Sequence, residues 1–242
     1  MEKRRIILRC LLTLVVGSTL LLSCLSDPEP VALDYLPDAI IQKITDNQEE
    51  KYAMVFWVYG NKELESGTVE GPASGSWTLE KNSTNNQVLS LSPEQEDYSS
   101  MMPEPGSYEF TVTSTQTDEA PVIMTDELED EELGAVVIDT VEFNNSELST
   151  EWQSVAGTDL YLVRLYDTSG ELLFISEQIA GNETEYTFNT SDQGWTGSTA
   201  AQEGETYILE LLAVLYESDA STNLEYNIQC ISIGSQQIIW GE

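Results

Sequence analysis

The sequence has no histidine and very few basic side chains. Nine lysines and arginines stand against 43 aspartates and glutamates among 242 residues, which gives a formal net charge of −34. Without histidine, the chain has no catalytic triad and no metal centre of the kinds that depend on an imidazole. A polyanion of this charge repels phosphate groups, so nucleic acid is excluded as a partner.

Catalytic and cofactor-binding motifs are lacking as well. The lysines beyond the first ten residues (Lys43, Lys51, Lys62 and Lys81) stand in no recognisable motif, and no glycine-rich phosphate loop joins a strand to a helix. Carboxylates occur throughout the chain, so no pair of them stands out as a hydrolase site. The sequence therefore predicts a protein that is not an enzyme and that has no cofactor and no metal site.

The N-terminus carries the pattern of an export signal. Basic residues within 3–9 precede an apolar run, Cys10–Leu22, which is shorter than the ~20 residues that a membrane-spanning helix needs. The run leads into Leu21–Cys24, which resembles the lipobox of bacterial lipoproteins. That resemblance implies removal of residues 1–23, lipidation of Cys24 and attachment to a membrane through the lipid. An ordinary secretory signal is the alternative.

The segment that follows Cys24 predicts a location. Acids and prolines alternate at its start, which predicts a flexible tether over residues 24–36. The short acidic stretch is similar to the export signal of Bacteroidetes surface lipoproteins. This similarity implies the outer membrane, with exposure at the cell surface; a periplasm-facing protein is the alternative. With Cys24 lipidated, Cys230 has no disulfide partner, and its apolar surroundings predict a buried thiol.

The remainder of the chain alternates like β-strands, not like helices. In the second half, residues 160–166 and 206–216 form two such stretches, separated from others at 172–176 and 185–189 by Gly, Asn and Asp. Strands bounded by turns at this spacing predict an antiparallel sandwich.

Residues from about 135 to 234 resemble a fibronectin type III domain in the order of these features, and the apolar segment Gln236–Trp240 beyond its last strand departs from that pattern. Trp152 stands at the place of its early core tryptophan, and Tyr161 and Val163 stand at inward positions of its central strand. Tyr207 matches its corner tyrosine. The resemblance implies that these four side chains lie in a shared core.

The first half repeats the pattern more faintly. Tyr52–Tyr59 is a continuous apolar run, and Tyr108, Phe110 and Val112 alternate with polar residues after a Pro-Gly turn. This alternation resembles Ig-like modules of bacterial surface proteins. The predicted fold class is all-β, with two tandem Ig-like (fibronectin type III-like) antiparallel β-sandwiches after a lipoprotein signal peptide.

Six acids in seven residues, Asp126–Glu132, separate the two halves. Their mutual repulsion predicts an extended segment or a short frayed helix. A calcium site is the alternative, because carboxylates suit that ion, although a contiguous run is more typical of a solvated segment. The predicted division of the chain is a signal peptide at 1–23, a tether at 24–36, an Ig-like sandwich at 37–125, an acidic linker at 126–133 and a fibronectin type III-like sandwich at 134–242.

Five tryptophans raise the question of carbohydrate stacking. Trp57, Trp77 and Trp152 are predicted to lie in the cores, since each belongs to a strand or a core position. Trp195 follows a turn and either plugs one end of the core or is exposed. Trp240 either pairs into the sheet or is presented near the C-terminus.

The outer face of the sixth strand in the second half is unusually apolar for a sandwich, apart from the charged pair Arg164 and Glu210. We expect something to cover it: the first sandwich, the apolar segment Gln236–Trp240 beyond the expected seventh strand, or a protein or glycan partner. The candidate interaction face consists of Leu162, Tyr166, Ile208, Leu212, Val214 and Tyr216.

These features together predict a non-catalytic, lipid-anchored protein of a cell envelope, with a role in adhesion, assembly or spacing within a surface complex. A glycan-binding accessory lipoprotein of a polysaccharide-uptake system is the first alternative, and exposed coplanar aromatic side chains would favour it. A fimbrial subunit is the second, and a removable terminal strand with an open groove would favour that.

Overall fold

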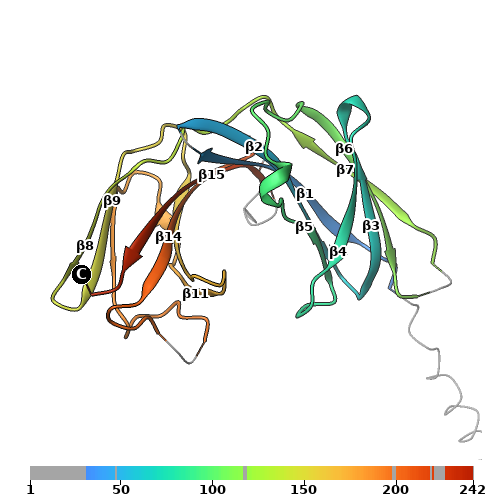
Figure 1. Ribbon diagram of the computed structural model, residues 1–242. Helices are drawn as coiled ribbons and strands as arrows, with labels where there is room; N and C mark the ends of the chain where they lie inside the picture. The colour runs from blue at the N-terminus through green and yellow to red at the C-terminus, as the bar shows by residue number, and fades with distance from the viewer. Residues whose placement is uncertain are drawn as a thin grey trace, which may run out of the picture. The chain divides into compact units, whose positions relative to one another are not determined.

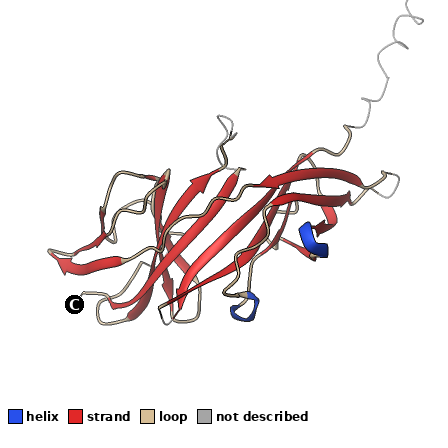
Figure 2. Ribbon diagram, turned by 90° about the horizontal axis from the view of Figure 1, so that it is seen from above, coloured by secondary structure: helices blue, strands red, loops and turns tan. Residues whose placement is uncertain are grey.

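The computed structural model describes residues 31–46, 48–116, 119–197, 200–218, 220 and 227–241. Regular structure in these residues is β-strand, apart from two short 3-10 helices, η1 (Pro72–Ser74) and η2 (Gln95–Asp97) (Figure 1, Figure 2). The fold is all-β and of the Ig-like sandwich kind, as predicted. Within the described ranges, no helix is long and apolar enough to cross a membrane.

The second half is a sandwich of two antiparallel layers. Strands β11-β10-β14-β15 form one layer in that order, with β12 beside β10, and β13-β9-β8 form the other. The strands are β8 (Ile138–Asn144), β9 (Glu147–Trp152), β10 (Leu160–Asp167), β11 (Leu172–Ile175), β12 (Ile179–Ala180), β13 (Glu185–Phe188), β14 (Thr206–Tyr216) and β15 (Ile228–Ile239). Aromatic rings join the two layers, as in the Trp152–Tyr161 contact with 5.2 Å between ring centroids.

The core residues predicted for this half are confirmed. Trp152 is 3% exposed, and Tyr161 and Val163 are fully buried, because alternate residues of a strand point to the same side of the sheet. Tyr207 is also buried, and its hydroxyl accepts a hydrogen bond of 2.9 Å from the backbone N–H of Gln202. A tyrosine bonded to backbone a few residues upstream is the corner arrangement of this kind of sandwich.

The segment Gln236–Trp240 does not lie over the outer face of β14, which corrects one of the expected covers. β15 extends to Ile239 and pairs with β14 from Tyr216 down to Thr206, so residues 236–239 are the end of β15 itself. Trp240 packs into the core end instead, against rings that include Phe143 and Trp195. Because β15 is twelve residues long, it pairs with β14 along the whole of that strand. Residues 236–239 are part of this pairing and do not fold over the outer face of β14.

The strands of the first half follow one another in the order β1-β2-β5-β4-β3-β6-β7. Its strands are β1 (Tyr35–Asp46), β2 (Glu49–Gly60), β3 (Leu64–Glu70), β4 (Ser76–Lys81), β5 (Val88–Leu91), β6 (Gly106–Ser114) and β7 (Val122–Leu128). Tyr108, Phe110 and Val112 are buried on one face of β6, as predicted. The hydroxyl of Tyr108 donates a 2.9 Å hydrogen bond to the carbonyl oxygen of Glu104, so this half has a corner tyrosine of its own.

The two halves share one sheet through β1. This strand pairs antiparallel with β2 along its whole length and parallel with β15, where Ile41–Ile44 face Cys230–Ile233 (Figure 1). Residues 33–242 accordingly form one compact unit. The division into domains at 125 and 134 stays a prediction. The expected tether needs correction at its end, because Leu33 is buried and β1 begins at Tyr35.

The acidic segment is extended, as one alternative held, but it is packed and not simply solvated. β7 continues through its first residues, and Asp126 is only 9% exposed. Beyond the strand, the side-chain amide of Gln229 donates to the backbone carbonyls of Glu129 (2.7 Å) and Glu131 (2.8 Å). The ammonium group of Lys43 binds the carbonyl of Leu133 at 3.0 Å. These polar contacts offset the repulsion that the sequence predicts.

Cys230 is fully buried in β15 beside β1 and carries a free thiol, as predicted. Burial raises the pKa of this thiol to about 11, because the thiolate would lose its hydration.

Candidate functional site

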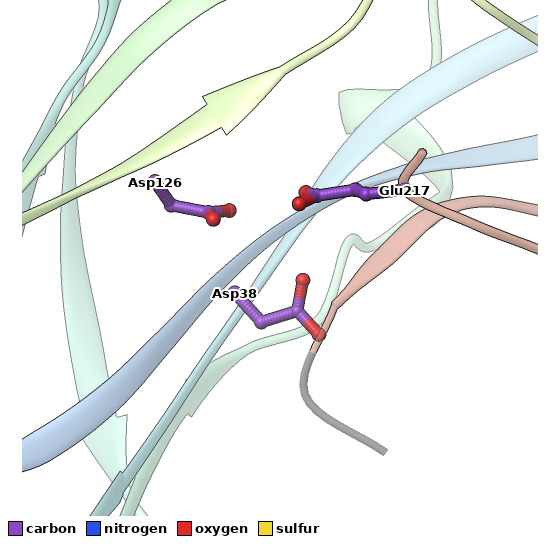
Figure 3. Close-up of side chains that lie close together, drawn as sticks. All are labelled: Asp38, Asp126 and Glu217. Atoms are coloured by element: carbon purple, nitrogen blue, oxygen red, sulfur yellow. The ribbon is translucent and has the colours of Figure 1, made fainter. Parts of the chain in front are cut away.

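Three carboxyl groups from distant parts of the sequence meet where the halves join. Asp38 lies on β1, Asp126 lies on β7, and Glu217 follows the end of β14. One oxygen of each lies within 4.8 Å of one oxygen of the other two, and all three residues are buried. Figure 3 shows the three side chains pointing toward one another. We call these residues the acid cluster.

Backbone and side-chain donors position the acid cluster. The backbone N–H of Ile228 donates to both oxygens of Asp38 at 3.3 Å, and that of Ala39 donates to Asp126 at 2.8 Å. The amide of Asn227 donates to Glu217 at 3.2 Å. The cluster is therefore fixed by the start of β1 and the start of β15, where the chain changes partners.

Burial raises the pKa of Asp38 well above its usual range. The carboxylate of Asp126 raises it further, the Ile228 N–H lowers it, and Glu217 raises it again. Among the described residues, no lysine or arginine forms an ion pair with Asp38. The pKa of Asp38 is raised because its ionised form loses hydration on burial and is further disfavoured by buried neighbours of like charge.

The acid cluster offers the oxygen ligands that calcium and magnesium take in proteins. Asp38, Asp126 and Glu217 are the residues that could hold such an ion. The calcium alternative from the sequence placed the site within Asp126–Glu132, and the structure differs on this point. Only Asp126 of that run joins the cluster; Glu132 instead pairs with Lys43 at 3.1 Å.

Asp38 also lines a cavity of about 310 Å³ on the same face of the sheet. This volume lies in the range of small-molecule sites. Side chains from five strands surround it, and most of them are apolar. The lining residues are Asp38, Ile40, Trp57, Val58, Tyr59, Val88, Arg164, Ile228 and Ile231.

Trp57 is not a core residue, which corrects the prediction. It is 43% exposed, and Tyr59, two residues along the same strand, is 37% exposed, whereas Phe56 and Val58 are fully buried. The face of β2 that carries Trp57 and Tyr59 is open only at the end of the strand, since Ala53 and Val55 on the same face are each 5% exposed. A continuous apolar run predicts burial on both faces, so the sequence could not distinguish Trp57 from its neighbours.

The other tryptophans do lie in or against the cores. Trp152 and Trp240 are each 3% exposed. Trp77 is half-buried and packs on Phe56, with 4.9 Å between ring centroids. Trp195 packs against Phe174 at 5.2 Å, so it closes one end of the second core. The core alternatives for Trp195 and Trp240 are therefore the ones that the structure adopts.

The centre of the candidate interaction face is buried. Leu212 is 1% exposed and Val214 is 3% exposed, so neither is open to a partner in this structure, which corrects their assignment. Leu162, Tyr166 and Tyr216 are half-buried. Ile208 is the most open of the six residues at 37%. A partner on these four residues stays a prediction.

One side chain of the first half bears on the cover of this face. Tyr98, which follows η2, accepts a hydrogen bond from the side chain of Gln42 on β1. Burial raises the pKa of Tyr98, the hydrogen bond with Gln42 lowers it, and the carboxylate of Glu210 on β14 raises it again. Cover by the first sandwich, one of the alternatives that the sequence offers, stays a prediction.

Sequence reasoning missed Asp38 and Glu217, since acids are everywhere in the chain and nothing marks these two. Their proximity depends on the parallel pairing of β1 with β15, a contact of high sequence separation. The predicted lipidation site, Cys24, lies outside the described residues.

Comparisons with known proteins give only distant likenesses. No protein-family model matches the sequence, and no curated protein matches it. Similar solved structures include a two-domain fibronectin type III segment of chicken tenascin, with 10% identity and a TM-score of 0.29, covering 85% of this chain and 99% of that one. A DUF3823 family protein from Bacteroides uniformis has 8% identity and a TM-score of 0.34, and the likeness covers 84% of this chain and 98% of that one.

A β-1,2-glucanase from Parabacteroides distasonis is also similar, with 11% identity and a TM-score of 0.30, covering 86% of this chain and 36% of that one. At these identities and scores, the likenesses do not bear on function.

Proposed function

We propose that the protein is a non-catalytic component of a bacterial cell envelope and that it acts as a spacer or assembly module. The observation that carries this proposal is the parallel pairing of β1 with β15, which makes one sheet out of strands from both halves. Tandem modules are by default mobile relative to one another unless a large interface joins them. A shared sheet supports a fixed spacing between the two ends of the unit.

The contacts of the acidic segment support the same role. The Lys43 ammonium group is buried and binds both Glu50 of β2 (3.0 Å) and Glu132 of the acidic segment (3.1 Å), so it ties the segment to the first half. Gln229 holds the backbone of the segment as described above. A segment that is bonded at several points restricts hinge motion between the halves.

The N-terminal pattern supports the envelope location. Residues 1–23 resemble a lipoprotein leader, so lipid on Cys24 would anchor the unit to a membrane, and the outer membrane is the proposed site. The fimbrial alternative is not favoured, because the terminal strand β15 is paired on both sides and is not an edge strand.

Spin labels on the two halves test the spacer proposal. We would replace Cys10 and Cys24 with alanine and label exposed positions, Thr68→Cys on β3 and Thr187→Cys on β13; the native Cys230 is buried. Pulsed electron paramagnetic resonance should give one narrow distance distribution, unchanged between low and high salt.

The control is a label pair within the first half, at exposed Thr68 on β3 and exposed Glu49 at the start of β2. A distribution between the halves as narrow as this control supports a spacer. A broad distribution that narrows with added salt would instead mean that the acidic segment is a hinge, and the spacer proposal would fail.

Glycan binding is a second candidate function, and the exposure of Trp57 and Tyr59 favours it. Neighbouring exposed aromatic side chains on one strand face, beside a cavity, offer a stacking surface for sugar rings. Loss of oligosaccharide binding in Trp57→Ala, with no loss in a variant of the half-buried Trp77, is the expected result if this function holds.

A further inference from the structure

Arg164 is an unusual residue in this chain. It is the sole arginine after residue 9, within a sequence of net charge −34. The lysines at 43, 51, 62 and 81 each form an ion pair with a carboxylate, whereas no carboxylate in the described part of the chain lies within ion-pair distance of Arg164. Its Nε is buried and has no hydrogen-bond partner among those residues.

One acid of the sheet, Glu210, is paired with Arg164 in register between β10 and β14. Arg164 lowers the pKa of Glu210, although burial raises it more. The two charges thus influence one another without forming an ion pair. The guanidinium group keeps donors that can serve a ligand, because its fork can bind a carboxylate with two hydrogen bonds.

The cavity beside Arg164 has aromatic and aliphatic walls. Trp57 and Tyr59 contribute partly exposed rings from β2, and Ile40 and Ile231 contribute aliphatic surface from β1 and β15. Asp38 adds a polar oxygen on another side of the cavity. Specific small-molecule sites combine such an apolar lining with a few polar groups that fix orientation.

We propose that this cavity binds a hexuronate, the carboxylate-bearing sugar of acidic polysaccharides. Arg164 pairs with the ligand carboxylate, the ring face lies against Trp57, and Asp38 accepts a hydrogen bond from a ring hydroxyl. The inference rests on the second candidate function, glycan binding, and names its ligand class.

Although the whole chain is strongly acidic, the local positive charge of Arg164 at the cavity favours an acidic sugar over a neutral one. A neutral sugar offers Arg164 only hydroxyl and ring oxygens, whereas a carboxylate can accept two charge-assisted hydrogen bonds from the guanidinium group, whose buried Nε has no partner among the described residues. A basic sugar would instead be attracted to the acid cluster and repelled by Arg164. Acidic, neutral and basic sugars with the same ring should therefore bind with different affinities, because they differ in the charge that they carry.

Tryptophan fluorescence of the full chain provides the readout, since Trp57 is far more exposed than Trp152 and Trp240. We would titrate methyl glucuronide, methyl glucoside and methyl glucosaminide, and use Trp57→Phe to assign the signal. The uronide is expected to bind at least tenfold more tightly than the glucoside, with the glucosaminide weakest.

Arg164→Gln should remove this preference, so that uronide and glucoside bind alike. The matched control is Lys81→Gln, which deletes one positive charge at an exposed ion pair on β4 and should leave the preference unchanged. Circular dichroism of both variants shows whether the fold persists; Arg164→Lys gives a second variant that keeps the charge but loses the fork.

The outcomes separate the two claims. Equal binding of uronide and glucoside by the native protein overturns the hexuronate inference but leaves glycan binding in place. Tighter binding of the glucosaminide means that the acid cluster selects the ligand, and the inference fails. Binding of none of the three glycosides overturns both the inference and the glycan-binding function.

Discussion

Asp38 is the buried side chain that most directly links pH to stability. Its pKa in the folded protein lies well above the usual value, through burial and through Asp126 and Glu217. The folded state therefore holds the proton more tightly than the unfolded state, whose aspartate titrates near about 3.9. The stability that this proton provides is present at acid pH and is lost as pH rises from about 4 through the folded pKa.

Asp38→Asn is expected to stabilise the protein at neutral pH. The amide removes one buried charge from the acid cluster and keeps an oxygen that accepts from Ile228. In the presence of a chelator, we expect the melting temperature at pH 8 to rise by at least about 2 °C, which corresponds to roughly 0.5–1 kcal/mol for a chain of this size. The gain should shrink towards pH 4.

Asp34→Asn is the control. This substitution also removes one negative charge, but Asp34 is exposed and lies four residues before Asp38. A lower melting temperature for Asp38→Asn at pH 8 in chelator would show that the ionised Asp38 is stabilising. That result would contradict the electrostatic description of the cluster.

Leu212 tests whether the outer face of β14 is structure or surface. It is 1% exposed, so Leu212→Asp places a charge in a desolvated site and should cost about 3 kcal/mol or more. The melting temperature is expected to fall by roughly 6–12 °C. Ile208→Asp, on the same face of the same strand but 37% exposed, should have a much smaller effect. Equal stability of the two variants would mean that Leu212 is open to partners.

At the scale of the elements, one glutamine binds the backbone of the acidic segment at three points. Gln229 is fully buried in β15, accepts from the backbone of Glu129 and donates to the carbonyls of Glu129 and Glu131. In Gln229→Ala these groups lose their partners, and the segment should become a substrate for a glutamate-specific protease. The measurement is limited proteolysis with peptide mapping.

Gln237→Ala is the matched control, since Gln237 is exposed on the same strand. This variant and the native protein should resist cleavage between 129 and 132. Rapid cleavage of the native protein at these sites would show that the segment is a solvated linker after all.

Local patterns predicted a large part of the strands and cores. The alternation of Tyr108, Phe110 and Val112 and the turn residues around β10 and β14 are signals within a few residues, and they identified the buried side chains. β1 was partly assigned to a tether, because its burial depends on β2 and β15, and β15 lies nearly two hundred residues away.

The same limit explains the candidate site. Asp126 was recognised only as part of a charge run, and its role depends on Asp38 and Glu217, which no local pattern connects with it. Trp57 was assigned to a core, because a continuous apolar run does not show which face of a strand another element covers. Non-local pairing, and not propensity, determines these features.

At the scale of the whole molecule, the proposed lipid anchoring depends on Cys24. With lipid on this residue, the native protein should enter the detergent phase after phase separation, since acylation supplies the membrane affinity that an acidic chain lacks. Cys24→Ala should move it to the aqueous phase or leave it as uncleaved precursor. Cys230→Ala is the control and should partition like the native protein. Unchanged partitioning of Cys24→Ala would contradict the lipoprotein proposal.

The central claim is that β1 and β15 join the two halves in one sheet, and amide hydrogen exchange tests it most directly. Amides of residues 41–44 that point away from β2, and those of 230–233 that point away from β14, have partners only in this pairing. We predict that they exchange as slowly as amides at the centre of β14, because they open only with the sheet. Exchange at the rate of an exposed turn such as Ser169–Gly170, with the β2-facing amides still protected, would contradict the shared sheet.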